Sequence, residues 1–105
     1  MSLAASRKGD YQELLLCTLL LERGYEVFRN VSCVGLVDIV VIDRSSTKTI
    51  LIDSKSPIVA NDGTLKGQQQ YITKEQQEKG ILAMTAWNNK IFYWSRTDRI
   101  AKEFV

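Results

Sequence analysis

Apolar side chains follow a helical pattern at the start of the chain and strand-like patterns after it. Residues 10–23 are rich in leucine, contain no glycine or proline and stop before Gly24, which predicts a helix that ends at a left-handed glycine. Residues 25–31 alternate apolar and polar side chains, as expected of a strand with one face less buried. Two β-branched runs, 38–43 and 49–55, flank the polar turn 44–48 and predict a hairpin covered on both faces.

The second half of the chain predicts a helix and a second hairpin. A loop over residues 56–63 follows the second β-branched run, and its length is typical of functional segments. Residues 64–79, which contain the spacing Thr73-x-x-Gln76, predict a helix that ends at Gly80. Strands are expected over 81–86 and 91–94, around an Asn-Asn turn, and Ser95-x-x-Asp98 predicts a short terminal helix. The order helix, three strands, helix, two strands and a terminal helix places the chain in the α/β class with a central mixed sheet.

Length and composition predict a single domain over residues 1–105. The chain has 45% hydrophobic and 25% charged residues, with six glycines and one proline. A domain of this size buries about 60 to 70% of its unfolded surface, so a ligand cleft is expected to be shallow or shared within a homodimer. The apolar stretch 14–21 falls far short of the roughly 20 residues of a membrane-spanning helix, so no membrane partner is expected.

The rare residues exclude several classes of site. The chain has no histidine, which excludes catalytic triads and zinc sites that need an imidazole. Its two cysteines provide no disulfide framework, and Cys17 lies in a leucine run where it is interpreted as a small hydrophobe. A cytoplasmic location is expected by default. Acid–base chemistry is left to carboxylates, lysine or tyrosine.

The predicted hairpin brings two carboxylates and an amine to one face. If Asp43 pairs with Lys48 across the turn, Asp38 faces Asp53 on the neighbouring strand. Such neighbours lie about 4.5 to 5.5 Å apart, and like charges at that distance are destabilising unless something neutralises them. Lys55 is two residues beyond Asp53 and shares its face. Two carboxylates beside an ammonium suit Mg²⁺ or Mn²⁺ and the hydrolysis of a phosphodiester.

The opening of the first helix adds charges that agree with this chemistry. Glu13 supplies a third carboxylate if the helix crosses the sheet near Asp38. The spacing Asp10-x-x-Glu13 is also that of a capping box, so a purely structural role for Glu13 stays open. Arg7 and Lys8 lie just ahead of the predicted helix, where a helix N-terminus favours an anion such as a DNA phosphate.

Three segments of the chain together resemble the PD-(D/E)XK nuclease superfamily. They are Arg7-Lys8-Gly9-x-x-x-Glu13, Gly35-Leu36-Val37-Asp38-Ile39-Val40-Val41 and Ile52-Asp53-Ser54-Lys55, in the family's order. The resemblance implies a three-layer restriction-endonuclease-like fold, αβββαββ. It also implies a catalytic set of five residues, namely Glu13, Asp38, Asp53, Lys55 and Gln69.

Within that set, the resemblance implies that Glu13, Asp38 and Asp53 ligate Mg²⁺ or Mn²⁺, that Lys55 assists the attacking water and that Gln69 lines the site. The chain is similar to small Holliday junction resolvases and to virus-type replication-repair nuclease modules. It departs from the family pattern at Val37, where the family often has proline, and at Asp53, where resolvases usually carry glutamate.

Taken together, the sequence predicts a Mg²⁺-dependent DNA endonuclease, homodimeric and selective for branched DNA in the manner of a Holliday junction resolvase. Arg7 and Lys8 are the expected DNA contacts, and no organic cofactor is expected. Two alternatives stay open. One is a catalytically silent DNA-binding or assembly module of the same fold, and the other is a restriction or repair nuclease that acts on linear duplex.

Overall fold

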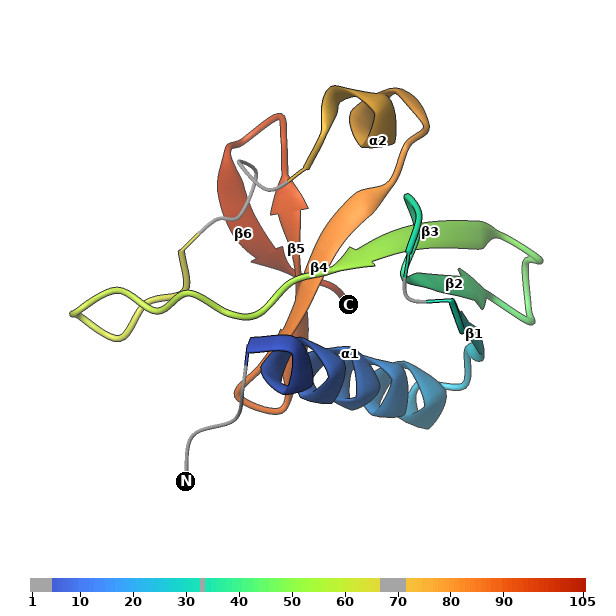
Figure 1. The fold of residues 1–105 in the computed structure, drawn as a ribbon, viewed down its shortest axis with the longest axis horizontal. Helices are drawn as coiled ribbons and strands as arrows, with labels where there is room; N and C mark the ends of the chain where they lie inside the picture. Colours follow the sequence, from blue (N-terminus) through green and yellow to red (C-terminus); the bar gives the residue numbers. More distant parts are fainter. Residues whose placement is uncertain (1–4, 33, 67–71) are drawn as a thin grey trace.

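Six hydrogen-bonded strands form one mixed sheet, and a long helix lies across it (Figure 1). This computed structural model describes residues 5–32, 34–66 and 72–105, with side chains in the first helix from residue 9 onward. The elements in chain order are α1 (Ala5–Glu22), β1 (Glu26–Arg29), β2 (Ile39–Ile42), β3 (Thr49–Ser54), α2 (Lys74–Glu78), β4 (Leu82–Trp87), β5 (Lys90–Ser95) and β6 (Ile100–Glu103). The strands follow one another in sequence order across the sheet, and among them β3 and β4 form the parallel pair. The α/β class and the mixed sheet are thereby confirmed.

Helix α1 begins earlier than the sequence pattern predicts and ends where it predicts. It starts at Ala5 rather than Asp10 and runs through Gly9, a residue that costs about 1 kcal/mol relative to alanine and that a helix of 18 residues tolerates. At the other end Gly24 has φ +88°. The Gly24 N–H donates to the Leu21 carbonyl, and the Tyr25 N–H donates to the Leu20 carbonyl, which is a Schellman termination.

The core lies between α1 and the face of the sheet that α1 covers. Its fully buried side chains come from both layers, and the largest are Leu16, Leu20, Ile39, Val41, Ile52, Met84 and Ile91. Cys17 is buried among them, and burial raises the pKa of its thiol, so its interpretation as a small hydrophobe is confirmed. Among the described helices, none is long and apolar enough to cross a membrane.

Both predicted hairpins form with the predicted turns. In the first, the Asp43 N–H donates to the Lys48 carbonyl at 2.8 Å, and Val41 pairs with Ile50 as the register required. In the second, Asn88 and Asn89 have φ of 54° and 60°, the left-handed pair that a two-residue turn between twisted strands favours.

The second helix is shorter than predicted. Thr73 and Gln76 form the expected capping box, and α2 ends before Gly80, but it spans only Lys74–Glu78. The prediction that it begins at Thr64 is wrong. The Asp62 carboxylate accepts from the Thr64 N–H, and Leu65 then bridges back to Val59 in a small antiparallel turn. The rest of the predicted first half, residues 67–71, lies outside the described residues.

The predicted terminal helix is also wrong, because the chain there forms a turn and a sixth strand. The Ser95 hydroxyl accepts from the Asp98 N–H, as a helix cap would, but Arg99 adopts φ 58° and stops the turn. Residues 100–103 then pair with β5. An edge of the sheet offers these residues backbone partners that an isolated helix of one turn lacks.

The burial pattern of α1 predicts different effects for two of its leucines. Leu16 is fully buried, whereas Leu14 is 50% exposed. Leu16→Ala is expected to lower the free energy of unfolding by about 2 to 5 kcal/mol, because it leaves a cavity against the sheet. Leu14→Ala is the matched control and is expected to cost about 1 kcal/mol or less, since leucine and alanine have similar helix propensities. Urea denaturation of both variants measures the difference, and equal losses would contradict this assignment of the core.

Candidate active site

Asp38 and Asp53 meet at the end of the β2–β3 hairpin, as the predicted register requires. Ile39 pairs with Ile52, so the residues on either side, Asp38 and Asp53, come opposite each other. The Asp38 N–H donates to the Ile52 carbonyl at 2.9 Å, and the Asp38 carboxylate accepts from the Ser54 N–H at 2.7 Å. The two carboxyl groups are near enough that Asp53 raises the pKa of Asp38. Asp38 is thus held beside Asp53 by backbone contacts of β3.

The pairing of the two acids changes the chemistry of Asp38. Burial is the main cause that raises the pKa of Asp38, the Ser54 N–H opposes it, and the charges of Asp53 and Glu13 add to the rise, so that the pKa reaches about 6. Burial and neighbouring like charges both disfavour a carboxylate, and both act here. A raised pKa of this kind, where two acids share an end of a sheet, is characteristic of functional sites.

Asp53 is the more buried acid and has partners on two sides. It is 8% exposed. Its Oδ2 lies 2.7 Å from the Lys55 Nζ, and its Oδ1 accepts from the Gln76 Nε2 at 3.2 Å. The predicted grouping of Asp38, Asp53 and Lys55 on one part of the hairpin is therefore present in the structure.

Gln76 is a residue of the candidate site that the sequence reasoning missed. It is 6% exposed, and its Nε2 also donates to the Leu36 carbonyl at 2.8 Å. Its Oε1 accepts from the Thr73 N–H as part of the capping box. One side chain thus fixes α2, the segment before β2 and Asp53 together. The spacing Thr73-x-x-Gln76 marked it only as a cap, and the glutamine expected at the site, Gln69, lies outside the described residues.

Glu13 lies near the pair of acids but is bound elsewhere. It is in the interior of α1, so the alternative in which it caps the helix is wrong. Its side chain is 14% exposed and forms an ion pair with Arg29 of β1. The Arg29 Nη2 also lies 3.7 Å from the Asp10 Oδ1. Its charge reaches Asp38, as the raised pKa there shows. Within the described part of the chain, Glu13, Asp38 and Asp53 are not arranged as a three-ligand metal group.

Arg7 and Lys8 lie inside α1 rather than ahead of it, because the helix begins at Ala5. The structure describes their backbone but not their side chains, so their role as DNA contacts stays a prediction. The helix N-terminus that was expected to favour an anion beside them is displaced toward residue 5.

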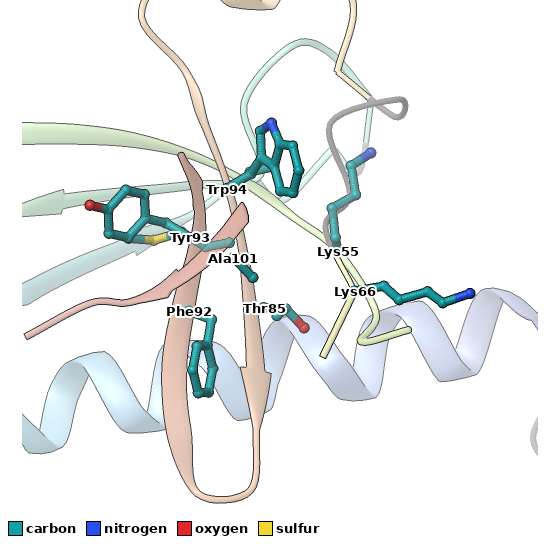
Figure 2. Close-up of a pocket in the computed structure, with 9 residues that line it drawn as sticks. Lys55, Lys66, Thr85, Phe92, Tyr93, Trp94 and Ala101 are labelled. Carbon is teal, nitrogen blue, oxygen red and sulfur yellow. The ribbon is translucent and has the colours of Figure 1, made fainter. Parts of the chain in front are cut away.

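Two cavities border the candidate site. A groove of ≈ 260 Å³ lies beside Asp38 and is lined by Phe28, Arg29, Asn30, Val37, Asp38 and Val40. A second cavity, of only ≈ 10 Å³, is lined by side chains that include Lys55, Thr85 and Trp94 (Figure 2). That volume is about the size of one water molecule, so the second cavity is a gap in the packing, too small for a ligand.

Comparisons with protein-family models, with curated proteins and with solved structures gave no match to this chain. The candidate site is therefore assigned from its own geometry and chemistry.

The raised pKa of Asp38 predicts a pH dependence of stability in the absence of divalent ions. Because the folded-state pKa of about 6 lies above the usual 3.8, the folded protein binds the proton more tightly. The free energy of unfolding should then fall as pH rises from about 4 to about 6. The rise in pKa corresponds to at most about 3 kcal/mol, and partial exposure to water lowers that figure.

Asp38→Asn isolates this contribution, since it keeps an oxygen that accepts from the Ser54 N–H but does not titrate. Urea denaturation from pH 4 to pH 7 in EDTA should show the wild type losing more stability than the variant across the window. Parallel curves for the two proteins would contradict the assignment.

Proposed function

We propose that the protein is a metal-dependent DNA endonuclease with a restriction-endonuclease-like fold. The observation that carries this proposal is the pair Asp38 and Asp53 at the end of a buried hairpin, with Lys55 in contact with Asp53. Two adjacent carboxylates, one of them with a raised pKa, are a poor arrangement for structure alone, since apolar side chains there would be less costly. They are a good arrangement for holding a cation.

The chemistry of the donor set fits Mg²⁺ or Mn²⁺. Mg²⁺ in proteins commonly takes one or two carboxylates and keeps several waters, which are replaced in part by oxygens of a phosphate substrate. Asp38 and Asp53 supply two such carboxylates. Glu13 joins the set only if its carboxylate exchanges Arg29 for the ion. Of the three predicted ligands, Asp38 and Asp53 already lie next to each other, whereas Glu13 must first leave its ion pair with Arg29.

The side chains of this chain have distinct roles in that chemistry. A bound divalent ion supplies Lewis acidity, which polarises a phosphodiester and lowers the pKa of a water molecule. Lys55, held beside Asp53, is placed to donate to the attacking water or to a phosphate oxygen as negative charge develops. Gln76 fixes the orientation of the Asp53 carboxylate through its hydrogen bond. Ser54 fixes Asp38 in the same way through its backbone N–H.

The resemblance to the PD-(D/E)XK superfamily supports DNA as the substrate. Its three segments contribute Glu13, Asp38, Asp53 and Lys55, and the last three meet at one end of the hairpin. The chain shows no base-reading motif, so selectivity for a DNA shape such as a four-way junction is the preferred form of the proposal. A homodimer would present two such sites to a symmetric substrate.

A catalytically silent DNA-binding or assembly module is the second candidate, and two contacts favour it. The Lys55 Nζ forms an ion pair with the Asp53 Oδ2 at 2.7 Å, and Arg29 forms an ion pair with the Glu13 carboxylate. In a silent module these ion pairs would be permanent and would replace the cation.

The test is cleavage of a labelled four-way DNA junction and of a matched linear duplex, each in Mg²⁺ and in Mn²⁺. Lys55→Ala is expected to lower the cleavage rate by about 10²- to 10³-fold, as the loss of a group that stabilises transition-state charge does. Lys48→Ala removes an exposed lysine at the far end of the same hairpin and is expected to leave the rate unchanged.

The outcomes separate the candidates. Junction-selective cleavage that depends on Lys55 supports the preferred form, and equal cleavage of both substrates assigns the nuclease to linear duplex. No Lys55-dependent cleavage of either substrate would overturn the enzyme and leave the silent module.

A further inference from the structure

A larger cleft lies between α2 and the turn that joins β5 to β6. Its volume is ≈ 520 Å³. Figure 1 shows α2 and this turn at the same end of the molecule. The cleft has an apolar floor formed by Ile81, Leu82 and Trp94. Its polar rim is formed by Gln77, Arg96 and Arg99. We refer to it as the α2–turn cleft.

The rim of the α2–turn cleft carries two arginines that have no counter-charge among the described residues. Arg96 and Arg99 are exposed, and within residues 5–32, 34–66 and 72–105 neither guanidinium makes a hydrogen bond or an ion pair. Asp98, the acid of the same turn, is already paired with Lys102, whose contact holds the pKa of Asp98 below its usual value. The two positive charges therefore remain available to an anion.

The floor contains a buried donor without a partner. Trp94 is 9% exposed, and its indole Nε1 is buried with no hydrogen-bond partner among the described residues. A buried indole N–H normally finds an acceptor. Figure 2 shows this nitrogen at the end of the ring that points away from Phe92. The Trp94 ring lines the cleft, so it offers an occupant an aromatic surface.

The α2–turn cleft adjoins the candidate active site through the sheet. Asp53 pairs with Ala83, and the pairing of Met84 with Tyr93 places Ala83 opposite Trp94. Neighbouring strands lie about 4.8 Å apart, so the backbones at Asp53 and Trp94 are separated by about 10 Å. Along a nucleic-acid strand that rises about 3.4 Å per nucleotide, this is about three nucleotides. In α2, Gln76 contacts Asp53 while the next residue, Gln77, lines the cleft.

We propose that the α2–turn cleft binds one nucleotide of a nucleic-acid strand, with its phosphate on Arg96 and Arg99 and its base against the Trp94 floor. The volume lies within the range of small-ligand sites. Arginine is the side chain best matched to phosphate, because its planar fork donates two parallel hydrogen bonds. An aromatic floor suits a base of any sequence. The inference rests on the proposed function, and it names where the strand lies beside the cleaved phosphate.

The turn itself supplies a variant that removes a charge without loss of folding. Arg99 has φ 58°, in the left-handed region that favours glycine. Arg99→Gly should therefore have a Tm no lower than that of the wild type while it deletes one guanidinium. Arg96→Ala is the companion variant. Arg44→Ala is the matched control, since it removes an exposed arginine from the β2–β3 turn, away from the cleft (Figure 1).

The experiment measures the affinity for a labelled oligothymidylate of ten nucleotides by fluorescence polarisation, in EDTA so that no cleavage occurs. Arg96→Ala and Arg99→Gly should each weaken binding by about tenfold, as loss of a hydrogen bond to a charged group does. Each should also reduce the dependence of log K on log salt by about one. Arg44→Ala should change the affinity by less than about twofold.

The floor is tested in a Trp87→Phe background, where Trp94 is the remaining tryptophan. Its emission should change as the oligonucleotide is added. A ten-residue oligoglutamate serves as an anion without bases and should bind at least about tenfold more weakly.

Wild-type affinity in both arginine variants would overturn the inference, and so would equal affinity for oligoglutamate or an unchanged Trp94 emission. These results are separable from the proposed function. Weaker binding in the arginine variants without any Lys55-dependent cleavage would support the cleft and reject the nuclease. Lys55-dependent cleavage with unaltered binding in the arginine variants would support the nuclease and reject the cleft.

Discussion

The antiparallel register between β2 and β3 is the constraint on which the rest of the structure depends. Ile39, Val41 and Ile52 must face the leucines of α1, and side chains alternate along a strand. Asp38 and Asp53 are therefore forced together on the opposite face. A slip of one residue would turn one strand's side chains to the other face, which would place its acid in the core and expose its isoleucines, so the hydrophobic effect itself maintains the crowding of the two charges.

That crowding explains the polar contacts around the hairpin end. Two acids held together by core packing need donors, and Ser54, Lys55 and Gln76 supply them from three directions. The donors leave Asp38 only partly compensated, which is why its pKa remains raised to about 6 by burial and by its acidic neighbours. Helix α2 is a little over one turn long, yet Gln76 ties it firmly to the site. The two neighbouring acids thus lower the stability of the fold at this site, and they concentrate negative charge there.

The sequence predicted what depends on local periodicity and missed what depends on contacts between distant elements. The β-branched runs, the Gly24 termination and the Asn88-Asn89 turn follow from neighbouring residues, and so does the meeting of Asp38 with Asp53. The strand at 100–103 forms because β5 offers an edge, which no local pattern reveals. The ion pair of Glu13 with Arg29 and the bond of Gln76 to Asp53 likewise join residues far apart in the chain, so their partners were not predictable from spacing.

The most direct test of this account is the thermal stability of the protein at pH 7 as Mn²⁺ is titrated in. If Asp38 and Asp53 form a site for a divalent ion, a hundredfold excess of Mn²⁺ over its Kd should raise the Tm by about 10 °C. Asp53→Asn should abolish the rise, since its amide still accepts from Gln76 but carries no charge, while Glu78→Gln on exposed α2 should retain it. An unchanged Tm in the wild type, or an equal rise in Asp53→Asn, would contradict the central claim.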